Sequence, residues 1–286
     1  MRKAWGVALL GLTMSVVSMQ AAAIRQAPIE ASMQVTGRLS IDAAGAVSGY
    51  ALDGKEKLPA QVTELLARTL PALRFERTPS GEGSGPIQAT MTLQVLATQA
   101  DADHMTISLH HARFVEAEPP VTERVSVDQR VALHYPHHAE DVGMTATVYV
   151  AVRIDRTGHV ADAQVRQVNL GGSDSEAHMR QWRKTFALPT LDAVRRFTFS
   201  IPTTGPHAND AYFSGVLPVS YQFRGERPGY GQWTVYVPGP KEEIAWLDRQ
   251  DAADDAGRPL RLLARRLAFV DPLDGTPRAF TSARWL

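Results

Sequence analysis

The stretch that decides the fold is VYVAVRIDRTGHVADAQV, residues 148–165, because its pattern also occurs near the start of the chain. Its apolar side chains recur at strand-like spacing on both sides of Thr157-Gly158, which is typical of two strands joined by a tight turn. Residues 36–52, TGRLSIDAAGAVSGYAL, share the frame I-D-x-x-G-x-V. This frame places Gly45 and Gly158 in the turns, where glycine supplies the positive φ that the bend needs. We therefore predict two β-hairpins of the same kind.

A helix with one apolar face is predicted after the first hairpin, within residues 58–75. Pro59 suits its first turn, and Pro71 ends or kinks it. Residues 87–97 and 104–114 then alternate as strands do, so the order is strand, strand, helix, strand, strand. The apolar residues of the helix recur at intervals of three and four: Val62, Leu65, Leu66 and Leu70.

The second hairpin is followed by the same order of elements. A helix is predicted from about Asp174, with a break at Pro189 and a short second helix from Leu191 to Phe197. A closing strand then runs from Gly215 to the end of the segment GVLPVSYQF. Its apolar residues on one face are Leu217, Val219, Tyr221 and Phe223. Antiparallel hairpins with separate helices predict an α+β fold.

The N-terminus has the pattern of an export signal, predicted as residues 1–23. Arg2 and Lys3 form a basic head, an apolar run extends from Trp5 to Met19, and Ala21 and Ala23 fit a cleavage site. As a helix, this run of about 15 residues spans only about 22 Å of the ~30 Å hydrocarbon core. We therefore expect cleavage near Ala23 and a periplasmic protein. The alternative is an uncleaved anchor in the inner membrane, which is the one case that would place the protein at a membrane.

Composition narrows the function classes. The chain has 286 residues, enough for two ordinary domains. Its 30 basic and 30 acidic residues balance, so nothing indicates nucleic-acid binding. An apolar content of 44% predicts a folded chain. Because there is no cysteine, disulfides and thiol nucleophiles are excluded.

Residues 133–224 contain five short motifs: Tyr135-Pro136-x-x-Ala139, Thr147-Val148-x-Val150, Ile154-Asp155-x-x-Gly158-x-Val160, Leu191-Asp192-Ala193-Val194-Arg195-Arg196-Phe197-x-Phe199 and Leu217-Pro218-Val219-x-Tyr221-x-Phe223. In content and order these motifs resemble the C-terminal domain of TonB-type energy transducers. A fainter version spans residues 31–98. On this basis the chain divides into a signal peptide, a degenerate TonB-like module at 24–120, a clearer module at 121–224 and an extension of unknown role at 225–286. A chance similarity of two unrelated hairpins is the alternative to tandem modules.

The resemblance implies a small antiparallel sheet whose edge strand takes up an extended peptide from an outer-membrane receptor or another envelope protein. An edge strand exposes unpaired N–H and C=O groups, and an added strand satisfies them. The candidate residues are those of the closing strand: Gly215, Leu217, Val219, Tyr221 and Phe223. Transducers of the family also have an anchor with a histidine and a Pro-rich spacer, and residues 5–33 show neither. TonB-dependent energy transduction is therefore left open.

Two other classes of function were weighed. In the structural class, the two modules pair with each other or across a homodimer, so that no edge is free. In the enzyme class, histidines gather at 110–111 and 134–138, but neither cluster has the spaced third ligand that zinc requires. We expect no catalytic residue, no metal and no cofactor.

Overall fold

The computed structural model describes residues 28–77, 86–99, 104–116, 119–223 and 228–247, and the backbone of strands at 267–270 and 277–278. The predicted signal peptide lies outside these residues. The architecture is α+β, with antiparallel sheets and a few helices, as the sequence predicted. Among the helices of the described residues, none is long and apolar enough to cross a membrane.

The first sheet is built around its longest pairing, between β1 and β4. β4 runs beside β1 over its whole length, and β5 adds the outer strand. The other side of β1 is shared, since β2 pairs with its second half and β11 with its first three residues. The strands are β1 (Glu30–Ile41), β2 (Val47–Leu52), β4 (Ile87–Gln99), β5 (Met105–Val115) and β11 (Thr234–Tyr236).

The predicted amphipathic helix is α1 (Ala60–Thr69), which begins after Pro59. Val62 and Leu66 are fully buried against the first sheet, as the spacing requires. Pro71 turns the end of the helix into a 3₁₀ turn. The strand β3 (Arg74–Arg77) was not predicted, because its four residues are too few for a period to show. The short 3₁₀ helices of this half are η1 (Lys55–Lys57) and η2 (Leu70–Ala72).

The second sheet has three antiparallel strands in the order β10-β7-β8. The strands β6 and β9 form a separate antiparallel pair. The elements of this half are η3 (Val121–Glu123), β6 (Ser126–Gln129), α2 (His137–Asp141), β7 (Ala146–Asp155), β8 (Val160–Leu170), α3 (Glu176–Val194), β9 (Thr198–Ser200) and β10 (Tyr212–Tyr221).

The predicted break at Pro189 was wrong, because α3 is one helix that runs through the proline. Phe186, Thr190 and Val194 are all fully buried on one face, so packing holds both sides of the proline on the same axis. The Thr190 hydroxyl also donates to the Phe186 carbonyl at 2.6 Å, which adds a bond to the turn that contains Pro189. Tertiary packing thus overrides the local cost of a helical proline.

The two hairpin turns make matching hydrogen bonds. In the first, Asp42 accepts from the backbone N–H of Ala46, and in the second Asp155 accepts from that of His159. The carbonyls of Gly45 and Gly158 each accept a bond of 2.8 Å from a later phenylalanine. The φ values of the two glycines are 80° and 81°. The repeated frame therefore corresponds to one turn geometry used twice.

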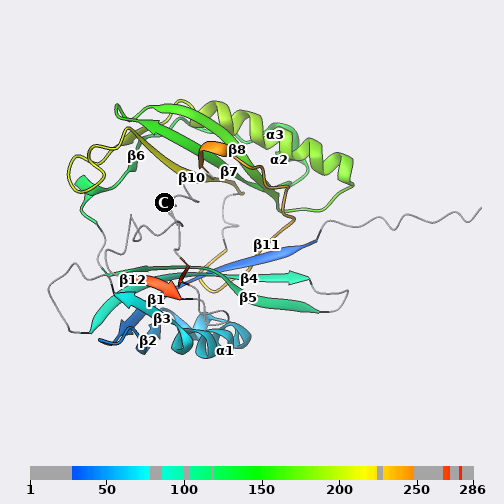
Figure 1. Cartoon of the computed structure of the whole chain (residues 1–286). Helices are drawn as coiled ribbons and strands as arrows, with labels where there is room; N and C mark the ends of the chain where they lie inside the picture. Colours follow the sequence, from blue (N-terminus) through cyan, green and yellow to red (C-terminus); the bar gives the residue numbers. More distant parts are fainter. Residues whose placement is uncertain are drawn as a thin grey trace, which may run out of the picture.

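The two sheets face each other, and their helices lie on the outer sides (Figure 1). Two large clusters of buried apolar side chains result, one among residues 33–114 and one mostly among residues 125–237. The tail returns to the first half, where β12 (Leu267–Val270) pairs with β3 and with β13 (Pro277–Arg278). One candidate site lies at an edge of the second sheet, and another lies between the two sheets.

Candidate functional site

The predicted partner-binding strand corresponds to β10, which lies at one end of the second sheet. In the described part of the chain its strand neighbour is β7 alone, paired from Tyr212 to Tyr221. In the first half of β10, Phe213 and Ser214 are buried at 6% exposure each, whereas Tyr212 is exposed. In the second half, from Val216 to Ser220, buried residues alternate with the exposed Pro218 and Ser220.

The opposite edge of the same sheet, on β8, is occupied by the chain itself. We call residues 237–242 the strap. Val237 donates to the Leu170 carbonyl at 2.7 Å and accepts from the Leu170 N–H at 3.1 Å. Further along, Glu242 donates to the Arg166 carbonyl at 2.8 Å. The strap thus satisfies backbone groups of β8 that an added strand would otherwise use.

The alternation of side chains along β10 determines which way the predicted site residues point. Leu217, Val219 and Tyr221 point into the apolar core beside α3 and are less than 10% exposed. Their side chains hold the strand in place, so a partner would meet its backbone. Phe223 lies beyond the end of the strand, which the sequence had extended too far. The strand stops at Tyr221 because β7 begins at Ala146, its pairing partner.

Pro218 sets which backbone groups face the open side of β10. Proline has no N–H to give to β7, so its nitrogen belongs on the side away from the ladder. Backbone groups in an antiparallel strand alternate in direction, and the N–H groups of Val216 and Ser220 therefore share this open side. Ser220 is also fixed through its hydroxyl, which lies 3.2 Å from that of Thr147 on β7.

An aromatic cluster anchors the far end of β10. The ring of Tyr135 stacks on Phe223 at 5.1 Å and meets Tyr221 edge-on at 5.7 Å, while its hydroxyl donates to the Met144 carbonyl. The Tyr221 hydroxyl lies 2.7 Å from that of Thr190, and burial raises the pKa of Tyr221. The Tyr-Pro motif and the closing motif are thus in direct contact, although 86 positions separate Tyr135 from Tyr221 (221 − 135).

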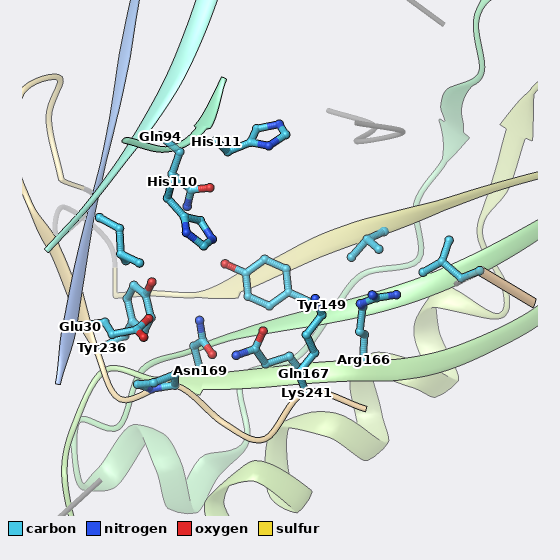
Figure 2. A pocket seen from close by; sticks show the side chains of 14 residues that line it. Glu30, Gln94, His110, His111, Tyr149, Arg166, Gln167, Asn169, Tyr236 and Lys241 are labelled. Carbon is cyan, nitrogen blue, oxygen red and sulfur yellow. The ribbon is translucent and has the colours of Figure 1, made fainter. Parts of the chain in front are cut away.

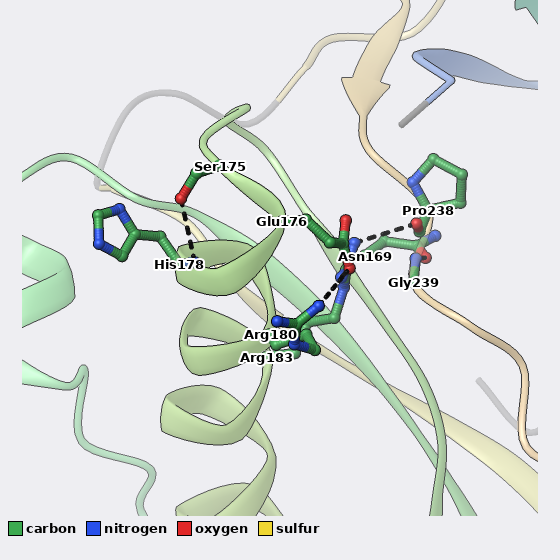
Figure 3. A network of polar contacts seen from close by, with 8 residues as sticks. All are labelled: Asn169, Ser175, Glu176, His178, Arg180, Arg183, Pro238 and Gly239. Atoms are coloured by element: carbon green, nitrogen blue, oxygen red, sulfur yellow. Dashed lines mark hydrogen bonds and ion pairs between the residues drawn. The ribbon is translucent and has the colours of Figure 1, made fainter. Parts of the chain in front are cut away.

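The strap is tied to α3 as well as to β8 (Figure 3). Arg183 donates to the Pro238 carbonyl at 3.3 Å, and its guanidinium lies 3.8 Å from Glu176. Ser175 caps the start of α3 by accepting from the His178 N–H. Because Arg183 is largely buried, this contact fixes the strap against the helix.

A polar cavity of about 420 Å³ lies between the two sheets (Figure 2). The sequence did not predict it, because its residues come from strands far apart in the chain. The first sheet contributes Glu30, Gln94, Leu96, His110, His111 and Tyr236; the second sheet and the segment after β11 contribute Tyr149, Arg166, Gln167, Asn169, Val216, Pro238, Lys241 and Leu247.

Two irregularities in strand pairing shape this cavity. The pairing of β4 with β5 shifts between Gln94 and Val95, so that His110 is an extra residue on β5. The pairing of β7 with β8 shifts between Tyr149 and Val150, which makes Arg166 the extra residue on β8. A bulge redirects a side chain relative to the regular alternation. Both extra residues line the cavity.

The acidic end of the cavity is formed by Glu30 and Tyr236, which are directly paired across β1 and β11. Burial raises the pKa of Tyr236 strongly, and the neighbouring Glu30 carboxylate raises it further by its charge and by accepting a hydrogen bond. Tyr236 is therefore a protonated donor to Glu30 at neutral pH.

The histidines singled out in the sequence do not form a common site. His138 stacks on Trp182 with ring centroids 5.1 Å apart, whereas His110 and His111 lie at the cavity. Within the described residues, no three His, Asp or Glu side chains gather as metal ligands would.

No protein-family model, no curated protein and no solved structure matches this chain. The resemblance to the TonB-type C-terminal domain thus rests on the sequence motifs, and the function drawn from it is a prediction.

Proposed function

We propose that this protein binds an extended segment of an envelope or outer-membrane transport protein by strand addition to the open edge of β10. The observation that carries the proposal is the contrast between the two edges of the second sheet. The strap covers β8, whereas β10 has one strand neighbour among the described residues. An uncovered edge of this kind recruits another strand through its backbone groups.

The chemistry of the edge suits a partner of loosely defined sequence. Val216 and Ser220 supply donors, and the carbonyls of Val216, Pro218 and Ser220 supply acceptors. With Leu217 and Val219 buried beneath, little side-chain selection is available on the inner face. Affinity for one such strand is expected to be modest, because each hydrogen bond contributes only about 1 kcal/mol net.

In this proposal the protein acts from the periplasm, and its partner is an outer-membrane receptor with a TonB box or another envelope protein. The motifs of residues 133–224 are the support for this partner class. Coupling to TonB-dependent transport is part of the same proposal.

The test is an NMR titration of the ¹⁵N-labelled chain from Ile24 with a receptor-derived TonB-box peptide. We expect saturable shifts centred on the amides of Val216 and Ser220, with smaller ones in β7. The control is the same peptide with two central residues replaced by proline, which cannot pair as a strand. If no β10 amide moves at millimolar peptide, strand addition of a receptor segment is wrong.

A matched pair of variants locates the binding edge. Ser220→Pro removes one of the two open donors, and Ser220→Ala keeps the N–H but loses the same contact with Thr147. We expect Ser220→Pro to weaken peptide binding about 10-fold relative to Ser220→Ala, since it deletes a hydrogen bond and adds a ring on the edge. Equal affinities would place the peptide elsewhere.

The structural alternative is favoured by one observation, the pairing of β11 with β1. Here a segment that follows the second sheet adds to the first sheet within one chain. If this is the whole role of strand addition, the chain is a monomer by light scattering, and the exchange rates of the Val216 and Ser220 amides do not change when the peptide is added. A homodimer would instead show protection of β10 that depends on protein concentration.

A further inference from the structure

The cavity between the sheets differs from the usual contact between two sheet layers. Facing sheets normally bury interdigitated apolar side chains. Here the facing residues include Gln94, Tyr149, Arg166, Gln167 and Asn169, which leave about 420 Å³ of space. This volume lies within the range of small-molecule sites, roughly 300 to 1,000 Å³. We propose that the cavity binds a small organic molecule that carries a carboxylate.

The charge of the lining selects the ligand class. Among the described residues of the lining, Arg166 and Lys241 carry a fixed positive charge and Glu30 carries a carboxylate. The Tyr236 phenol donates to Glu30 at its own end of the cavity. The guanidinium of Arg166 has the planar geometry that binds a carboxylate through two parallel hydrogen bonds. Lys241 is an exposed residue of the lining and adds a second charge that attracts an anion.

The walls are fixed before any ligand arrives. Gln167 donates through Nε2 to the Gly239 carbonyl at 3.0 Å, and the Asn169 Oδ1 accepts from the Gly239 N–H at 3.2 Å. Arg166 is held at a bulge, and its own carbonyl accepts from Glu242. The strap therefore sets the position of the arginine at the backbone. A site held in this way loses little conformational entropy on binding.

The test is isothermal titration of the full folded chain with glutarate and with citrate at constant ionic strength. Glutaramide, which has the length of glutarate without its charge, is the ligand control. We expect saturable binding of at least one carboxylate and none of glutaramide. Chemical shift changes should centre on Tyr149, Arg166 and Lys241, which separates this site from the β10 edge.

Two variants test the cations independently. Arg166→Gln and Lys241→Gln should each weaken binding about 10-fold or more, through the loss of a charge-assisted hydrogen bond. Lys184→Gln, an exposed position on α3 away from the cavity, changes the net charge equally and should leave the affinity unchanged. Because Lys241 lies in an irregular exposed segment, its variant stays informative even where Arg166→Gln lowers stability.

Three results would overturn the proposal. The first is no saturable binding of either carboxylate at 20 mM, a concentration that detects affinities down to about 10 mM. The second is an affinity that both cavity variants leave unchanged, which would mean that the anion binds elsewhere. The third is binding of glutaramide as tight as that of glutarate, which would show that the ligand's charge does not contribute to recognition. None of these outcomes depends on whether β10 binds a peptide.

Discussion

The two hairpins have turns of the same geometry, but they differ in the length of their second strand. β8 has 11 residues and pairs with β7 from Ala146 to Ile154, whereas β2 has only 6 and pairs with the second half of β1. The first three residues of β1 pair with β11, and between the β11 and β2 pairings the Tyr230 hydroxyl bonds the backbone of Thr36. A short hairpin strand thus leaves an edge that a distant segment of the same chain fills.

The largest effect is expected at the two turn glycines, where the hairpins are most alike. A Cβ on Gly45 would lie 2.0 Å from the Phe75 carbonyl oxygen, and one on Gly158 would lie 2.1 Å from that of Phe199. Alanine at either position therefore adds a backbone clash to the strain of positive φ. We expect each variant to lose about 3 kcal/mol of unfolding free energy, measured by urea denaturation.

Gly143 provides the control for strain alone. Its φ is 69°, yet a Cβ there would meet nothing within 4 Å. Gly143→Ala should therefore cost only about 1 kcal/mol. If Gly45→Ala and Gly158→Ala cost no more than this, the close approach of the phenylalanine carbonyls is not a real constraint. If only one of them is costly, the two turns are not equivalent.

The next effect concerns the point where β11 ends and the strap begins. Val237 is 3% exposed and packs in the second core, while Val235, two positions earlier, is 57% exposed. Val237→Ala should lower the unfolding free energy by about 2 kcal/mol, because it removes buried methyl groups and leaves a cavity. Val235→Ala should change it by less than about 0.5 kcal/mol. Thermal unfolding of both variants checks this, and equal losses would show that the strap is not packed as described.

The smallest effect is an electrostatic difference between the turns. The Thr157 hydroxyl donates to Asp155, and this bond is the main cause that lowers the pKa of Asp155 below its ordinary value of 3.8. The first turn has alanine, Ala44, at the corresponding position. Thr157→Ala should raise the pKa of Asp155 toward 3.8, as followed by carboxyl carbon NMR, whereas Thr157→Ser should keep it low.

The direction of the Asp155 pKa shift determines how the stability depends on pH. A carboxylate with a lowered pKa stabilises the fold above pH 3.8, and its contribution disappears as the pH falls through the folded-state pKa. Thr157→Ala should therefore reduce stability mainly at pH 4 and above, and the difference from the native chain should vanish in stronger acid. A constant difference at all pH values would assign the effect of Thr157 to packing instead.

Local pattern was enough to predict the regular elements of the fold. The α+β class, both hairpins and the buried face of α1 all depend on neighbours within a few positions. The continuous helix through Pro189 was missed because its cause is non-local: Thr190 and Phe186 are held by the sheet and by Tyr221.

The candidate sites were less accessible to sequence reasoning. The position of β10 at an edge depends on the order of the strands in the sheet, which the alternation within each strand does not contain. The cavity depends on two bulges, at His110 and Arg166, and neither leaves a mark on the alternation strong enough to separate it from chance. The nearest signal was the run VRQVNL, residues 165–170, where regular alternation fails.

The pairing of Glu30 with Tyr236 has a consequence for how the chain folds. These partners are roughly 200 residues apart, so closing that contact carries a large loop entropy and comes late in folding. During synthesis from the N-terminus, the first sheet forms before β11 has been made. The side of β1 that later pairs with β11 stays exposed until the last quarter of the chain is synthesised. That interval is when the exposed edge is open to pairing with another copy, and chaperone dependence should be greatest there.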